Sequence, residues 1–263
     1  MSQALVRRPS PQLATGLVTH IERQPVNVDL ALRQWQAYVD AFAACGWTNT
    51  EVPPAEDCPD SVFVEDALVM FEDLGVITRP GAPTRLPEID VVPEIVATLG
   101  LESARIAAPG TLDGGDILKV GSDIYVGSGG RTNAEGVRQL RGILEPRGYA
   151  VIAVPVTKVL HLKSAVTALP DRTVIGFEPL VDDTRLFPRF RPMPEESGSH
   201  VVVIDDETVL MAADCPRSVE LIENLGYRVV TVDIGEFQKL EGCVTCLSVR
   251  VRDVQSRRPL PGR

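Results

Sequence analysis

The chain has 263 residues, of which 44% are hydrophobic and 24% charged, values typical of a globular protein that can bury a sizeable core. Its formal net charge of −10 disfavours a surface for nucleic acid or an anionic membrane, because both bind clustered cations. No apolar run approaches the roughly 20 residues of a membrane span, and the first residues lack a secretory signal pattern. Five cysteines form an odd set in a chain too large to need disulfides, so we expect a reduced, cytoplasmic protein.

The predicted elements repeat an order of strand, turn, strand, helix and strand about every 40–50 residues. The predicted strands are 61–71, 74–78, 116–120, 123–127, 165–169, 173–177, 201–204, 208–212, 227–232 and 243–251. The predicted helices are about 29–45, a segment that ends before Gly100, a segment from a capping box at Thr132 and Glu135 to Gly148, and 216–225. We expect the Pro-rich stretch 187–194 to be an irregular loop.

Two folds fit this order of elements. One is a cyclic array of ββαβ modules, in which the starts of the strands meet at one central face. The other is an ordinary α/β sheet built from units that look alike. The periodicity alone favours neither of them.

His161 is the strongest candidate for an acid/base among the three histidines. It lies between two leucines, a setting that also suits an ordinary core histidine, whereas His20 and His200 have less distinctive neighbours. Asp113, ahead of two glycines, has the chemistry to accept an imidazole N–H and orient the ring, although a turn residue would have the same pattern.

Cys243 and Cys246 form a C-x-x-C pair. Zinc binding lacks a second ligand pair, and a redox motif would open a helix rather than the terminal strand predicted here. A buried structural pair and a single nucleophilic cysteine remain as interpretations.

Charged residues of interest lie around one apolar strand and in two loops. Asp60, Glu65 and Asp66 surround an apolar strand, where a carboxylate facing inward must be paired. Paired carboxylates match the planar fork of a guanidinium ion. Arg85 and Arg131 lie in Pro- or Gly-rich loops, either as surface residues or as a bidentate grip on a substrate carboxylate.

Six short words of the sequence occur in an order that resembles the dimethylarginine dimethylaminohydrolase family, hydrolytic members of the guanidino-group-modifying superfamily. The words are PDSVFVEDA (Pro59 to Ala67), ITRPGAPTR (Ile77 to Arg85), APGTLDGGDIL (Ala108 to Leu118), RTNAEG (Arg131 to Gly136), VLHLKS (Val159 to Ser164) and EGCVTCLS (Glu241 to Ser248). They cover nearly the whole chain apart from the first dozen residues and the tail after Val254.

The resemblance implies a five-bladed α/β propeller of ββαβ modules, the pentein fold. It also implies a role for individual residues: Cys246 as nucleophile, His161 as general acid/base and Asp113 as the carboxylate that orients it. The residues that would bind substrate by the same resemblance are Asp60, Glu65, Asp66, Arg85, Arg131, Leu17 through its backbone carbonyl, and Leu240 through another backbone contact. Cys243 is outside the family motif and is interpreted as a bystander.

The implied activity is hydrolysis of Nω-methylated L-arginine to L-citrulline and dimethylamine or methylamine, through a thiouronium intermediate on Cys246. We hypothesise that Cys246 keeps a near-normal thiol pKa while the site is empty. No metal or organic cofactor is expected, and the predicted partner is a small cationic amino acid, without nucleic acid or membrane. The alternatives are an arginine deiminase, a non-catalytic arginine sensor and, more distantly, a redox protein.

For the organisation of the chain, we expect a single catalytic domain over 1–263, with flexible termini at 1–13 and 255–263. The protein is expected to be a monomer or a homodimer.

Overall fold

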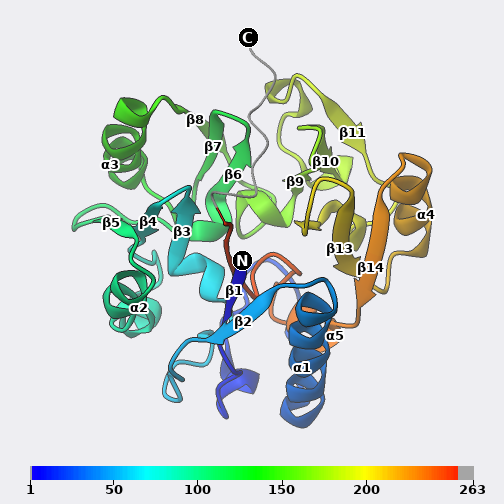
Figure 1. The fold of residues 1–263 in the computed structure, drawn as a ribbon, viewed down its shortest axis with the longest axis horizontal. Helices are drawn as coiled ribbons and strands as arrows, with labels where there is room; N and C mark the ends of the chain where they lie inside the picture. The colour runs from blue at the N-terminus through cyan, green and yellow to red at the C-terminus, as the bar shows by residue number, and fades with distance from the viewer. Residues whose placement is uncertain (1, 254–263) are drawn as a thin grey trace.

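Five three-stranded sheets are arranged as blades around a common centre in the computed structural model, which describes residues 2–253 (Figure 1). Blade 1 contains β15 (Val249–Val251), β1 (Gln3–Val6) and β2 (Thr48–Glu51). Blade 2 contains β3 (Leu68–Phe71), β4 (Leu74–Ile77) and β5 (Glu102–Arg105). Blade 3 contains β6 (Ile117–Val120), β7 (Asp123–Ser128) and β8 (Ala150–Pro155). Blade 4 contains β9 (Val166–Ala168), β10 (Val174–Gly176) and β11 (Phe190–Pro192). Blade 5 contains β12 (Val202–Val203), β13 (Thr208–Ala212) and β14 (Arg228–Val232).

Helices connect the blades' strands on the outside of the ring (Figure 1). The α-helices are α1 (Val28–Ala44), α2 (Val92–Thr98), α3 (Ala134–Leu144), α4 (Pro216–Asn224) and α5 (Gly235–Gln238). The 3₁₀ helices are η1 (Leu13–Thr15), η2 (Val64–Asp66), η3 (Pro83–Ile89), η4 (Gly114–Asp116), η5 (Glu145–Arg147), η6 (Leu162–Ser164), η7 (Glu178–Leu180), η8 (Thr184–Leu186) and η9 (Ser197–Ser199). Among residues 2–253, no helix has both the length and the apolar character needed to cross a bilayer.

Each blade has the same strand pattern, an antiparallel pair followed by a parallel pair. In blade 3, for example, β6 pairs with β7 antiparallel and β7 pairs with β8 parallel, with α3 as the crossover. The cyclic array of ββαβ modules is therefore confirmed, and the open sheet is excluded. Blade 1 combines strands from the N-terminal and C-terminal segments of the chain, because β1 pairs antiparallel with β15 and parallel with β2.

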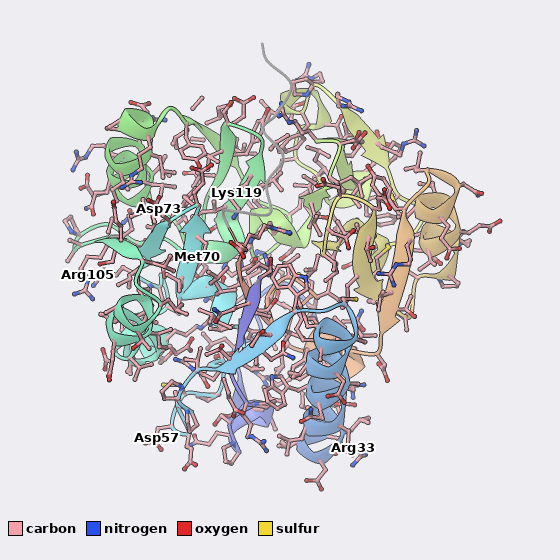
Figure 2. All side chains as sticks on the ribbon, in the orientation of Figure 1. Arg33, Asp57, Met70, Asp73, Arg105 and Lys119 are labelled. Atoms are coloured by element: carbon pink, nitrogen blue, oxygen red, sulfur yellow. The ribbon has the colours of Figure 1, made fainter. Side chains whose placement is uncertain are left out.

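The hydrophobic core is divided into layers between adjacent blades. Successive residues of β3 alternate between two of them: Leu68 packs in the layer against blade 1, and Val69 in the layer against blade 3. Polar contacts also join blades: the Lys119 ammonium donates a hydrogen bond at 2.9 Å to the carbonyl of Met70 (Figure 2). Both faces of β3 and β4 are buried, and their sequences, LVMF and LGVI, are therefore apolar throughout rather than alternating.

The expected flexible terminus at 1–13 is wrong for the residues that the structure describes. Gln3–Val6 is the middle strand of blade 1, and Leu5 is completely buried. Pairing partners on both sides, one of them from the far end of the chain, hold this segment, and no local pattern indicates such a partner. The other expected flexible segment, 255–263, lies outside the described residues.

Four features of the structure differ from the expectation. Within the predicted strand 61–71 the chain forms η2 before β3 begins, and within 243–251 a turn precedes β15. In the predicted irregular loop 187–194, the short strand β11 pairs parallel with β10. The predicted N-cap of α3 is also wrong, since Asn133 caps the helix, whereas the Thr132 hydroxyl donates to Asp116 at 2.6 Å.

The substitution Leu5→Ala tests the role of β1 in closing the ring. Removing a fully buried leucine side chain leaves a cavity, so we expect the free energy of unfolding in urea to fall by about 2–5 kcal/mol. The partly exposed Leu225→Ala is the matched control and should change it much less. Equal effects of both substitutions would contradict a structural role for the N-terminal strand.

Candidate active site

A pocket lies at the centre of the ring, where the turns that precede the first strands of several blades meet. Its lining residues are Leu17, Asp60, Phe63, Asp66, Arg85, Arg131, Leu160, His161, Leu240, Glu241, Gly242 and Cys246. Of the site residues predicted from the sequence, all except Asp113 and Glu65 line this pocket. The pocket has a volume of ≈ 20 Å³, which is room for about one water molecule. An amino acid could therefore enter only if lining residues move.

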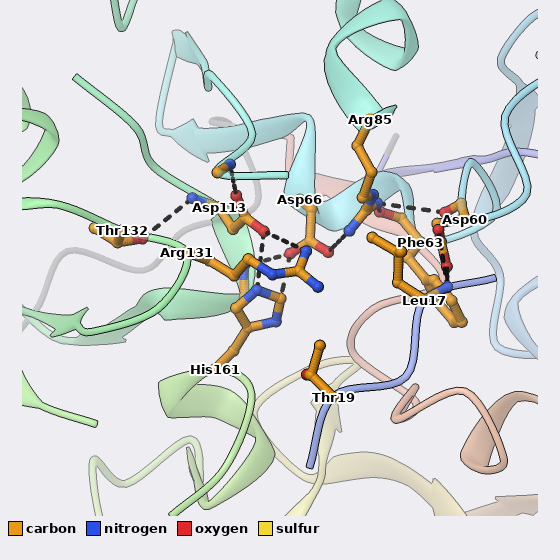
Figure 3. A network of polar contacts seen from close by, with 12 residues as sticks. Leu17, Thr19, Asp60, Phe63, Asp66, Arg85, Asp113, Arg131, Thr132 and His161 are labelled. Atoms are coloured by element: carbon orange, nitrogen blue, oxygen red, sulfur yellow. Dashed lines mark hydrogen bonds and ion pairs between the residues drawn. The ribbon is translucent and has the colours of Figure 1, made fainter. Parts of the chain in front are cut away.

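His161 and Asp113 form the predicted pair. The Nε2–H of His161 donates to Asp113 Oδ2 at 3.0 Å, and both side chains are buried (Figure 3). The other carboxylate oxygen accepts the backbone N–H of Gly81 at 2.7 Å. Asp113 is thus fixed from both sides, and it holds one ring nitrogen while leaving Nδ1 toward the pocket.

Asp66 faces the other side of the same histidine. Its Oδ1 lies 4.0 Å from His161 Nδ1 and accepts the backbone N–H of Gly115 at 2.8 Å. Its Oδ2 accepts a hydrogen bond at 2.7 Å from Arg85 Nη1. Burial opposes the charge on this carboxylate, but His161 and Arg85 outweigh it and hold the pKa of Asp66 well below its usual range.

The carboxylates around His161 decide its protonation. Burial lowers the pKa of the imidazole, but Asp66, the hydrogen bond to Asp113, and Asp116 more than offset this and raise it to about 9. The side chain is therefore an imidazolium at neutral pH, ready to donate a proton to a leaving group.

Two glycines allow these three turns to meet. A Cβ on Gly114 would lie 1.9 Å from the carbonyl oxygen of Glu65, and one on Gly115 would lie 2.6 Å from Nδ1 of His161. Any side chain at either position would separate the turn carrying Asp113 from its neighbours. The Gly-Gly pair after Asp113 is therefore a requirement of close approach.

Cys246 lines the pocket from the turn before β15. Its backbone carbonyl accepts the N–H of Glu65 at 3.2 Å, which ties this turn to η2. The hydrogen bond with Cys243, burial, and the carboxylates of Glu65 and Asp66 raise the pKa of the Cys246 thiol well above its usual range. The hypothesis of a near-normal pKa understated this effect, because it did not include the second thiol.

Glu65 is paired away from the pocket. Its Oε1 lies 2.6 Å from both Lys163 Nζ and Arg250 Nη2, and its side chain is buried. The sequence placed Glu65 beside Asp66 as a ligand for the guanidinium. In the structure its ion pairs with Lys163 and Arg250 instead link η2 to η6 and β15.

The two predicted carboxylate-binding arginines differ in how far their donors are used. Arg85 donates to Asp66 and, through Nε and Nη2 at 2.9 and 2.8 Å, to both carboxylate oxygens of Glu88. Arg131 lies 3.7 Å from Asp113, and its Nη1 has no hydrogen-bond partner among the described residues. Arg131 is therefore the more available cation for an incoming carboxylate (Figure 3).

Two acids hold the segment that covers the pocket. Asp60 accepts the backbone N–H of Leu17 at 3.0 Å, and burial raises the pKa of this carboxyl group. Glu241 accepts the backbone N–H groups of Thr19 and His20 at 2.7 and 2.8 Å. These bonds hold the segment that carries Leu17 at the wall of the pocket.

The ligand atoms of Asp66, Asp113 and His161 lie within 4.8 Å of one another, a spacing that could hold a metal ion. Their existing bonds compete with that use. Asp66 already accepts from Arg85 and a backbone N–H, and a metal would require His161 to lose its proton. The donor set favours proton transfer over metal binding.

Sequence reasoning missed six residues that line or support the pocket. Glu88 neutralises Arg85, and Asp116 accepts the backbone N–H of Leu162 at 3.0 Å, beside His161. Phe63, Leu160, Glu241 and Gly242 line the pocket. The sequence holds a signal for two of these residues. Glu88 lies three residues after Arg85, on the same face of a helical turn, and Glu241 directly precedes Gly242.

A cysteine thiol, an oriented imidazolium and buried carboxylates at the centre of a five-bladed α/β propeller define a cysteine-dependent enzyme of the pentein class. The chain is 63% identical over 252 residues to the N(G),N(G)-dimethylarginine dimethylaminohydrolase of Streptomyces coelicolor, covering 96% of this chain and 98% of that protein. It is 38% identical to the enzyme of the same name from Pseudomonas aeruginosa, covering 94% and 98%. The chain belongs to the dimethylarginine dimethylaminohydrolase family, as its sequence words predicted.

Solved structures agree with this assignment. The Pseudomonas aeruginosa enzyme, as a cysteine-to-serine variant complexed with citrulline, matches with a TM-score of 0.87 at 37% identity, covering 94% of this chain and 98% of that one. A dimethylarginine dimethylaminohydrolase variant in adduct with S-methyl-L-thiocitrulline gives 0.88 at 37% identity, with the same coverage. The N-terminal domain of a cyanobacterial arginine dihydrolase gives 0.85 at 19% identity, covering 96% and 98%, and shares the fold. No family model matches the chain.

The raised pKa of His161 predicts a pH-dependent contribution to stability. A folded-state value of about 9, against roughly 6.5 when unfolded, gives stabilisation that is complete below pH 6.5 and is lost as the pH rises toward 9. We expect the unfolding free energy of the wild type to fall by about 3 kcal/mol more than that of His161→Gln across this range. Urea titrations at both ends of the range measure it, and parallel losses in the two proteins would refute the shift.

Proposed function

We propose that this protein hydrolyses Nω-methylated L-arginine, asymmetric dimethylarginine or monomethylarginine, to L-citrulline and dimethylamine or methylamine. The observation that supports it most directly is the Asp66–His161–Asp113 cluster beside the thiol of Cys246. Membership in the dimethylarginine dimethylaminohydrolase family supports the same substrate class. Citrulline, bound in the Pseudomonas aeruginosa relative, is the product that this reaction requires.

The substrate is a cation, and we assign its guanidinium group to Asp66. A buried carboxylate with a strongly lowered pKa stays ionised at neutral pH and attracts a planar cation. Attack by a thiolate on the guanidinium carbon produces a neutral tetrahedral adduct, so the site needs carboxylates rather than an oxyanion hole. Holding the carbon next to Cys246 converts the attack into an intramolecular step.

Substrate binding also activates the nucleophile in this proposal. In the empty site the acidic neighbours and the second thiol keep Cys246 protonated. A guanidinium ion beside the sulfur adds a positive charge that favours the thiolate, and the proton leaves to solvent. The enzyme is thereby reactive chiefly when its own substrate is present.

We assign both later proton transfers to His161. As an imidazolium it donates a proton to the departing dimethylamine or methylamine when the carbon–nitrogen bond breaks. The neutral ring then accepts a proton from the water that attacks the thiouronium carbon, and collapse of that adduct breaks the carbon–sulfur bond and releases citrulline. Asp113 orients the ring through both transfers.

The amino-acid end of the substrate is assigned to the residues around Leu17. The carbonyls of Leu17 and Leu240, with Asp60, would receive the α-ammonium group, and Arg131 would receive the α-carboxylate. Arg85 would act mainly by fixing Asp66, because its donors are already committed. The reaction needs a free thiol, and we place the protein in the cytoplasm on that ground.

The first test is citrulline release from asymmetric dimethylarginine, monomethylarginine and arginine, run beside Cys246→Ser. We expect release from the methylated substrates and a rate at background level for the variant, because the hydroxyl group is a much weaker nucleophile. Turnover of arginine alone would indicate a deiminase. Ligand binding without citrulline from any of the three would indicate a sensor.

A second test separates the two arginines. Arg131→Met should raise KM for the methylated arginine with a smaller change in kcat, because the lost interaction is with a group remote from the reacting carbon. Arg85→Met should lower kcat and also the unfolding free energy, since it leaves Asp66 and Glu88 buried without their partner. Equal effects of both variants on KM would contradict this division of roles.

A further inference from the structure

Cys243 and Cys246 lie side by side in the turn before β15, the strand that completes blade 1. Their Sγ atoms are 3.2 Å apart, and both residues are free thiols in the structure. The N–H of Cys246 donates to the carbonyl of Cys243 at 3.1 Å, which closes a four-residue turn. The end Cα atoms of such turns lie less than about 7 Å apart, and disulfides span Cα separations of roughly 4.4–6.8 Å.

The two thiols face different cavities. Cys246 lines the small central pocket, whereas Cys243 lines a neighbouring cavity of ≈ 370 Å³. The rim of this second cavity includes the exposed residues His20, Ile21 and Lys158. A small oxidant can therefore reach Cys243 through a space much larger than a water molecule, without entering the substrate pocket.

The surroundings of Cys243 favour its thiolate over that of Cys246. The hydrogen bond from Cys246 lowers the pKa of the Cys243 thiol, with support from His200 and from the Thr245 hydroxyl 3.3 Å away. Glu65 raises the pKa of both thiols, and Asp66 raises that of Cys246 in addition. The more oxidisable sulfur is thus the one beside the larger cavity.

We propose that Cys243 is a redox partner of the nucleophile, and that hydrogen peroxide converts the two thiols into a reversible Cys243–Cys246 disulfide that switches the enzyme off. The expected loss of activity rests on the proposed function of Cys246 as nucleophile, whereas formation of the disulfide does not. In this proposal Cys243 takes part in the chemistry of the site and is not the bystander that the sequence suggested.

The steps balance without another reactant. The Cys243 thiolate attacks one peroxide oxygen and breaks the O–O bond, which gives a sulfenic acid and, with a proton, water. The Cys246 sulfur displaces the hydroxyl from that sulfenic acid, so an S–S bond forms, an S–O bond breaks and a second water leaves. The two sulfurs lose two electrons and the peroxide gains them, and a dithiol reductant reverses the change by exchange.

The bond requires only a small local movement. The sulfurs need to approach by roughly 1 Å to reach the disulfide length of about 2.05 Å. Once Cys246 is bonded it has no thiolate for attack on a guanidinium carbon. The bond also protects it, because a disulfide does not continue to the irreversible sulfinic acid.

Peptide mapping tests the proposal directly. Trypsin cleavage after Lys239 and Arg250 releases the peptide 240–250, which contains both cysteines and no other. Reduced protein is treated with increasing hydrogen peroxide, alkylated with iodoacetamide and digested without reductant. We expect this peptide to lose two hydrogens and remain unalkylated, in step with loss of citrulline release, and dithiothreitol to restore both the thiols and the activity.

Two variants complete the experiment, each compared with its own untreated activity. Cys243→Ser should give no linked peptide, and its peroxide inactivation should persist after dithiothreitol because Cys246 proceeds to the sulfinic acid. Cys45→Ser, which changes a cysteine at the end of α1, should behave as the wild type.

Other outcomes are equally clear. Wild-type peptide with both thiols alkylated after inactivation, or with sulfinic acid on Cys246 and alkylated Cys243, would overturn the proposal. A disulfide that forms in protein lacking methylarginine hydrolysis would instead refute the proposed function and leave the redox pair standing.

Discussion

The pairing of β15 with β1 is the constraint on which the rest of the molecule depends. It joins the N-terminal and C-terminal segments of the chain in one blade and closes the ring of five sheets. With the ring closed, every blade packs against two neighbours, and the turns before the first strands face a common centre (Figure 1). Closure therefore brings Cys246, directly before β15, into the same pocket as Asp66 and His161 from the second and fourth blades.

Buried charge is the second organising feature, and it is arranged as small groups of ion pairs. Arg85 forms ion pairs with Asp66 and Glu88, and Glu65 forms ion pairs with cations from two other elements. Such groups are costly to desolvate and tolerate loss of one partner poorly, so they fix the relative positions of the turns. The surrounding carboxylates raise the pKa of His161, and the second thiol, burial and carboxylates raise the pKa of Cys246, so both side chains are protonated in the empty site.

Sequence reasoning was most accurate where a signal is local. The period of the apolar pattern located α1 and the paired strands, and glycines marked the ends of helices. It was least accurate at the centre of the ring, where η2 and the turn of Cys243–Ser248 stand in place of predicted strand. Residues there are buried on all sides, so an apolar pattern cannot distinguish a strand from a 3₁₀ turn. Six ordered words identified the family, and the resemblance led to eight of the twelve residues that line the pocket.

The sequence by itself determined the repeated modules, the family and the side chains available for chemistry, because these depend on local pattern and on residue type. Only the tertiary structure decided how those side chains are used. It assigned Glu65 to Lys163 and Arg250, left a donor of Arg131 free, and set the thiol of Cys243 beside that of Cys246. These outcomes depend on distances between blades that are remote in sequence, and a pKa or an ion pair is fixed by such distances rather than by neighbours along the chain.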